Sequence, residues 1–262
     1  MLSRAEASGF GAKFPLADES AKKEIYSKHS PLATSSRTHS FHWDLRSWRS
    51  EYIGYNCEEM ACYLSTFKPL CFTAAGRQAV ARFRHPPFVD ASCRREPDFE
   101  SPYPSISTIC HGDLFAPRLR RVDRIAFLTV KRHYPGHDSA HWRLVAALEV
   151  AERFETHQAA ADWYHAQALP LPSNCMVREN APLGVEHTAE PRKDLREWDL
   201  GYWKRTRRTG VFLACRALRL RLHEPPVVTK ADLIAIFGKV PVTRNPPSIS
   251  ETQFDKLVCL FS

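Results

Sequence analysis

The fold is decided by two apolar runs, RIAFLTVK at residues 124–131 and WRLVAALEV at residues 142–150. Both runs have the length of strands and are rich in residues that favour strands. The loop between them contains Pro135-Gly136, a pair that marks a turn. Thr156 follows the second run, and threonine is a residue type that caps helix N-termini. We therefore predict a strand hairpin followed by a helix that packs on one face of it.

The chain beyond this hairpin supplies a third strand and two helices. Residues 211–222 predict a strand, and its second half, LRLRL, alternates so that leucines face the core and arginines face water or an anion. Thr229 is placed to begin one helix and Gly238 to end it. Ser250 is placed to begin another, and Gln253 completes a capping box with it.

The chain before the hairpin gives weaker patterns. Residues 27–40 scatter serine, threonine, lysine and histidine without sustained periodicity. We expect residues 1–85 to be a partly disordered or appended N-terminal extension. Prolines then punctuate an extended or turning segment, within which residues 105–110 could form a short helical turn. We place the folded domain at residues 86–262.

The charge of the chain favours an anionic partner. The formal net charge is +8, and nucleic acid, DNA or RNA, is the commonest partner of such a protein. Arginine forks suit phosphates, and two clusters supply the phosphate-binding candidates Arg118, Arg120, Arg121, Arg205, Arg207 and Arg208. A solvated surface is the alternative interpretation of either cluster.

The sequence contains no membrane or secretion signal that we can identify. No apolar run approaches the length of a membrane-spanning helix, and the N-terminus lacks the apolar core of a secretory signal. We therefore expect a cytoplasmic protein that does not bind membranes. The eight cysteines include no Cys-x-x-Cys pair, which argues against a zinc ribbon and favours reduced thiols.

Enzymatic chemistry is not required by any motif. His133, His137 and His141 are spaced four apart, but the Pro-Gly pair among them breaks the helix that would align them on a metal. Cys175 and His187 could form a nucleophile and base, yet no catalytic signature surrounds them. The chain also lacks a glycine-rich phosphate loop and a carboxylate–lysine nuclease set. We assign no catalytic residue, metal or cofactor.

Several segments carry a family resemblance. They are FAPRL at 115–119, DRIAF at 123–127, HWRLVAALEV at 141–150, LPSNC at 171–175 and TRNPPSIS at 243–250. In this order they resemble the PUA-like superfamily, which includes the ASCH, EVE and YTH domains, and more specifically the nucleotide-modification-associated domains grouped near it. The likeness covers about residues 88–261. It implies an α+β fold in which helices decorate a small, curved β-barrel.

The resemblance also implies a function, because members mostly bind RNA or modified bases in a pocket beside the barrel. We expect a nucleic-acid or modified-nucleobase reader linked to DNA or RNA modification. The base-pocket candidates, at one end of the barrel, are Trp142, Ser173, Asn174, Trp203, Arg244 and Asn245. Tryptophan, with Tyr202, offers stacking, asparagine reads a base edge and arginine holds a phosphate. Core packing of the tryptophans and turn capping by the asparagines remain alternatives.

Two other classes of function stay open. One is an enzyme acting on a nucleotide or base, with His133, His141 or Cys175 near the chemistry. The other is a protein-interaction module whose basic surface is incidental. A phosphate-driven reader differs from both because its affinity must fall steeply with salt.

Overall fold

The computed structural model describes residues 60–109 and 114–262, and within these ranges seven strands form one mixed sheet. The strands are β1 Cys62–Phe67, β2 Ser105–Ser107, β3 Arg124–Thr129, β4 Trp142–Phe154, β5 Phe212–Leu220, β6 Val227–Val228 and β7 Ser248–Ile249. The sheet order is β2-β5-β4-β3-β1-β7, and β6 pairs with β4 beside this path. β1 and β3 are parallel, and the other pairs are antiparallel.

Five α-helices accompany the sheet in the described ranges. They are α1 Ala74–Phe83, α2 His157–Ala166, α3 Leu195–Thr206, α4 Lys230–Phe237 and α5 Glu251–Val258. The predicted caps are confirmed: Thr156 caps α2, and Ser250 forms a capping box with Gln253 at α5. Thr229 caps α4, which ends at Gly238 in the left-handed conformation. None of these helices combines the length and apolar composition that a membrane crossing requires.

The predicted hairpin is the centre of the sheet. β3 and β4 pair antiparallel from Arg124 opposite Glu149 to Leu128 opposite Leu144. Register shifts interrupt the pairing of β4 with β3 and, at two places, with β5. Such bulges bend strands and increase their twist. The path nevertheless runs from β2 to β7 as an open sheet in the described residues. The expected mixture of helices and strands is confirmed, whereas the expected closed barrel is not.

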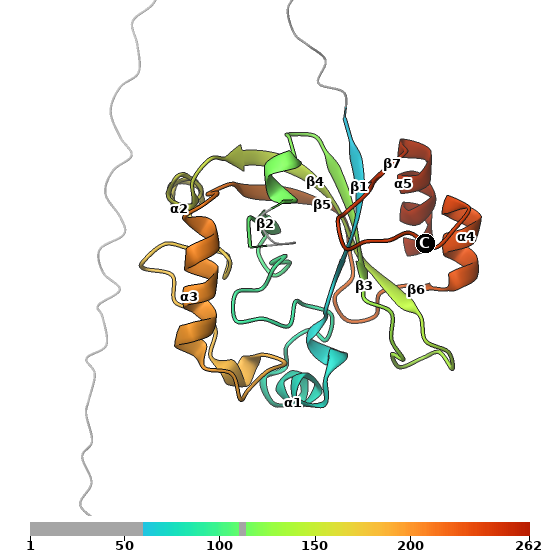
Figure 1. The fold of residues 1–262 in the computed structure, drawn as a ribbon, viewed down its shortest axis with the longest axis horizontal. Helices are drawn as coiled ribbons and strands as arrows, with labels where there is room; N and C mark the ends of the chain where they lie inside the picture. The colour runs from blue at the N-terminus through green and yellow to red at the C-terminus, as the bar shows by residue number, and fades with distance from the viewer. Residues whose placement is uncertain (1–59, 110–113) are drawn as a thin grey trace, which may run out of the picture. The chain divides into compact units, whose positions relative to one another are not determined.

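Strand alternation divides the core between the two faces of the sheet. Ile125 and Phe127 of β3 pack into one cluster with residues of β1 and β4, whereas Ala126 and Leu128 pack into another. Leu233 of α4 and residues of α5 cover the second cluster. Figure 1 shows α4 and α5 together on that side, with α1 and α3 across the sheet from them.

Part of the expected N-terminal extension belongs to this sheet. β1 lies between β3 and β7, and α1 follows it, although both fall before residue 86. Contacts group the described residues, 60–109 and 114–262, into one compact unit. Residues 105–107 form a strand rather than a helical turn. The expectations for residues 1–59 lie outside the described residues.

Candidate functional site

Helix α3 presents two aromatic side chains, Trp198 and Tyr202, that lie one turn apart. The indole Nε1 of Trp198 donates to the Tyr202 hydroxyl over 2.9 Å. The helix is anchored by Arg94, a fully buried arginine that pairs with Asp199 over 2.7 Å. Arg94 also donates to two loop carbonyls, which fixes the helix against the loop at residues 173–180. The contacts of Arg94 therefore hold α3, and with it Trp198 and Tyr202, in place.

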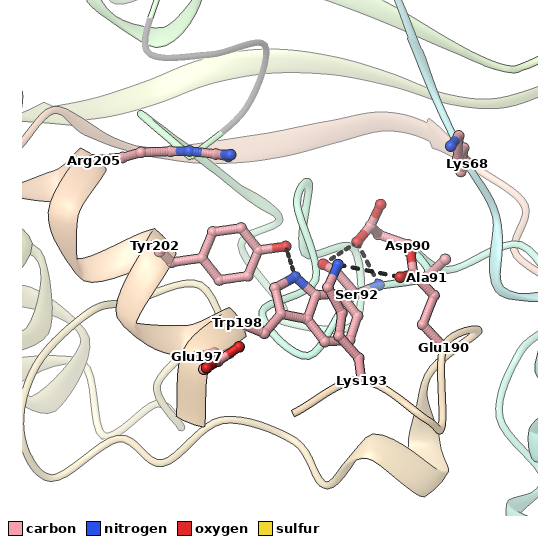
Figure 2. A pocket seen from close by; sticks show the side chains of 11 residues that line it. Lys68, Asp90, Ala91, Ser92, Glu190, Lys193, Glu197, Trp198, Tyr202 and Arg205 are labelled. Carbon is pink, nitrogen blue, oxygen red and sulfur yellow. Dashed lines mark hydrogen bonds and ion pairs between the residues drawn. The ribbon is translucent and has the colours of Figure 1, made fainter. Parts of the chain in front are cut away.

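A cavity of about 390 Å³ opens in front of this pair, and we call it the α3 pocket. Its lining includes Lys68, Asp90, Ser92, Trp198, Tyr202 and Arg205. Figure 2 shows Tyr202 from α3 on one side and Asp90 on the other, with Trp198, Ser92 and Lys193 close together between them. The amine of Lys193 lies 4.1 Å from the centre of the Trp198 ring. Lys68 and Arg205 complete the view at opposite edges.

The carboxyl group of Asp90 is the polar centre of the wall opposite α3. One of its oxygens accepts from the backbone amide of Ser92 over 2.9 Å and from the Ser92 hydroxyl over 2.5 Å. The second oxygen points away from Ser92 (Figure 2). Burial raises the pKa of Asp90 because water no longer solvates the ionised form. The wall therefore offers hydrogen-bonding groups held by local backbone.

Two cations flank the aromatic and carboxyl walls. Lys68 follows β1 and is exposed. Arg205, in the last turn of α3, donates to the carbonyl of Ile109 over 3.4 Å, and its guanidinium carbon lies 5.5 Å from the centre of the Tyr202 ring. Both side chains can reach an anionic group attached to a ligand in the pocket.

A second cavity of about 230 Å³ shares Lys68, Asp90 and Tyr202 with the first and adds Glu96. Glu96 accepts from the amide and hydroxyl of Ser107 over 2.9 and 2.6 Å and from the side-chain amide of Asn174 over 3.0 Å. Burial outweighs these bonds and raises the pKa of Glu96 to about 8. Glu96 is therefore mostly protonated at neutral pH.

Three of the six predicted base-pocket residues lie near α3, but none lines the α3 pocket. Ser173 donates through its amide and hydroxyl to Asp98, both over 2.7 Å. Asn174 is fully buried between Glu96 and Ser105, so its amide has no free edge for a base. Trp203 donates to Asp199 over 3.2 Å.

The other three candidates are elsewhere in the fold. Trp142 packs against the core cluster that α4 and α5 cover, and Trp203 packs against a different cluster beneath α3. Arg244 and Asn245 are exposed in the loop that precedes β7. The six residues do not form one pocket, because the sheet separates the two tryptophan environments and Asn174 turns inward to bond a buried carboxyl.

The predicted phosphate-binding arginines also separate. Of the six, Arg205 lines the α3 pocket, and Arg207 and Arg208 are exposed just beyond α3. In the other cluster, Arg121 pairs with Glu152 over 3.4 Å. The guanidinium carbon of Arg118 lies 5.4 Å from the centre of the Tyr63 ring, and Arg120 is exposed.

The residues considered for catalysis are not assembled. Cys175 is buried, which raises the pKa of its thiol to about 12, whereas His187 is hydrogen-bonded to His85 over 2.9 Å. His141 is buried too, with its Nδ1 2.8 Å from the Ser139 carbonyl oxygen. In residues 60–109 and 114–262, no group of three or more His, Cys, Asp or Glu is arranged to hold a metal ion.

Sequence reasoning named Tyr202 and Arg205 but missed the remaining lining of the α3 pocket. Lys68 fell in the expected extension, and Asp90 and Ser92 fell in the proline-punctuated segment. A usable signal did exist for α3: Asp194 is a capping residue type, and Trp198 and Tyr202 follow it with helical spacing. Nothing local could have paired this helix with residues 68 and 90.

Comparisons with known proteins return no relative. No family model matches the chain, and no curated protein or solved structure matches it. The geometry of the α3 pocket therefore carries the functional argument by itself.

Proposed function

We propose that the α3 pocket binds a nucleobase and that the protein is a nucleic-acid or modified-nucleobase reader associated with DNA or RNA modification. The observation that carries this proposal is the arrangement of Trp198, Tyr202 and the Asp90 carboxyl around a cavity of about 390 Å³. Lys68 and Arg205 flank that arrangement.

Each part of the arrangement suits one part of a nucleotide. An unstacked base needs an aromatic surface, and α3 supplies the partly exposed ring of Trp198, beside which Tyr202 is buried. A carboxyl group accepts hydrogen bonds from exocyclic amines such as that of cytosine, and Asp90 lines the same cavity as Trp198. Lysine and arginine bind the phosphates that accompany the base. The mixed character of the lining fits a base better than it fits a purely apolar ligand.

The proposal includes a PUA-like fold. It is supported by the mixed sheet, by the bulges in β4 that bend it, and by a pocket formed where α3 and the loop at residues 90–96 meet. The described path runs from β2 to β7 as an open sheet. Closure of the sheet into a barrel is therefore proposed and not observed.

The test is equilibrium binding of labelled single-stranded DNA and RNA to Trp198→Ala and Trp198→Phe. Stacking on an aromatic side chain contributes about 1–3 kcal/mol per base, so alanine should weaken binding roughly 5- to 150-fold. Phenylalanine retains a ring and should retain most of the affinity. Equal affinity of the wild type and Trp198→Ala would contradict the proposal, and no binding at low salt would favour a protein-interaction module.

One observation favours a second candidate, an enzyme acting on the bound base. Glu96 lines the cavity of about 230 Å³ and has a pKa of about 8, so it holds a proton that a general acid could transfer near neutral pH. Turnover of nucleosides should then decline above about pH 8 and be lost in Glu96→Gln while binding persists. Binding without turnover in the wild type would leave the reader as the function.

A further inference from the structure

A third cavity, which we call the basic cleft, lies beside α1 and the loop between β3 and β4. It is a cavity of about 1160 Å³ lined by Arg77, Lys131, Arg132 and Arg143, and Glu224 is its one carboxylate. Positive charge gathered in a concavity attracts anions more strongly than the same charge on a convex surface. Neither arginine cluster in the sequence predicted this site, because its cations come from separate segments.

Among the described residues, the cations of the basic cleft have no acidic partner. Within residues 60–109 and 114–262, none of the four forms an ion pair, whereas Arg94, Arg121, Arg124 and Arg153 elsewhere do. Four cations against one carboxylate leave a net positive cleft that only an anion can neutralise.

Arg143 shows how this charge is held in place. Its guanidinium donates to the backbone carbonyls of Pro225, over 2.8 Å, and of Pro135. Its Nε is buried and has no partner in the described residues. Carbonyls orient the cation without neutralising it, so Arg143 remains available as a fixed positive charge in the cleft.

The Phe72 ring lies near a cation of the basic cleft and near a cation of the α3 pocket. The guanidinium carbon of Arg132, in the cleft, lies 4.5 Å from the centre of the Phe72 ring. The amine of Lys68, in the α3 pocket, lies 6.0 Å from the same centre. Cations of the two sites therefore flank a single side chain, and one extended anion can contact both.

We infer that the basic cleft binds consecutive phosphates of a single nucleic-acid strand whose base enters the α3 pocket. This inference rests on the proposed function and specifies its ligand as a strand rather than a free nucleoside. A single strand fits because its bases are already unstacked or easily unstacked, and its backbone follows positively charged grooves. Guanidinium groups, three of the four cations, match phosphate oxygens in geometry.

The test compares two variants that lose the same charge. The cleft variant carries Arg77→Gln, Lys131→Gln and Arg132→Gln, all at exposed positions, and the control carries Arg118→Gln, Arg120→Gln and Arg121→Gln. Affinity for a mixed-sequence single-stranded oligonucleotide is measured across a sodium chloride series. Each phosphate contact on a single strand contributes about 0.7 to the log–log salt slope, so the cleft variant should lose about 2 units. The control should keep the wild-type slope.

Equal losses of slope in the two variants would overturn the inference, as would displacement of the oligonucleotide by polyglutamate at equal charge. Its failure is distinguishable from that of the proposed function. If nucleosides bind and Trp198→Ala weakens them, but the oligonucleotide binds no tighter, the cleft fails and the base pocket stands. If the cleft variant loses slope while Trp198→Ala changes nothing, the cleft binds a backbone and the base pocket fails.

Discussion

At the residue scale, Asn174 is a polar side chain whose role is to hydrogen-bond other buried polar groups. Its amide donates to Glu96 and to the Ser105 carbonyl, and its oxygen accepts from the Ser105 hydroxyl over 2.7 Å. We predict that Asn174→Ala lowers the free energy of unfolding by about 1–3 kcal/mol, because buried polar partners lose their bonds. Urea unfolding measures this, with exposed Asn245→Ala as the control expected within about 0.5 kcal/mol. An unchanged urea midpoint together with altered base preference would restore Asn174 to the ligand site.

Glu96 should make stability depend on pH. Its pKa is raised from 4.5 to about 8 in the folded protein, so between these values the folded state keeps a proton that the unfolded state has released. Stability therefore falls as pH rises through this window and is constant, as far as Glu96 is concerned, below and above it. We predict that urea unfolding shows a smaller fall from pH 5 to pH 8 in Glu96→Gln than in the wild type. Parallel profiles for the two proteins would contradict the raised pKa.

Residue roles were the least predictable part of the site. Asn174 and Asn245 are both asparagines in proline-braced loops, yet one is fully buried and the other exposed. The difference arises because Asn174 lies against Glu96, which is distant in the sequence and itself buried. A local pattern identifies a loop but does not say which way its side chains point.

At the scale of single elements, we predict opposite changes in stability when two helical glycines are replaced by alanine. Gly76 lies in the first turn of α1, where an added Cβ would fall 1.7 Å from the Leu70 carbonyl oxygen. Gly201 lies within α3, and an added Cβ there would meet nothing within 4 Å. We predict that Gly76→Ala destabilises the protein, because backbone must shift, and that Gly201→Ala stabilises it by about 0.5–1 kcal/mol. Thermal unfolding of both variants decides, and a stabilised Gly76→Ala would show that α1 does not pack on residue 70 as described.

Strands and helices whose pattern or cap lies within a few residues of sequence were predictable, whereas β1 was not. β3, β4 and β5 carry strand patterns, and the caps of α2, α4 and α5 are written within a few residues. β1 is short and buried on both faces, so it shows no alternation that separates it from a loop. Its stability comes from parallel pairing with β3, more than fifty residues away, which no local pattern encodes.

At the scale of the whole molecule, the distribution of charge matters more than its total. The net charge of +8 predicted an anionic partner but not where it would bind. The arginine-rich runs of the sequence are dispersed or partly paired in the fold, whereas Arg77, Lys131, Arg132 and Arg143 converge from separate segments. Tertiary structure alone brings them next to the α3 pocket.

The most direct measurement of the central claim, that a base enters the α3 pocket, is photocrosslinking. A single-stranded oligonucleotide with one photoreactive base is irradiated with the protein, and mass spectrometry of the peptides locates the crosslink. We expect crosslinks at Trp198 or Tyr202 in α3, and their loss when an excess of unmodified strand competes. Crosslinks confined to residues 118–121 or to the loop around Arg244, with none in α3, would contradict it.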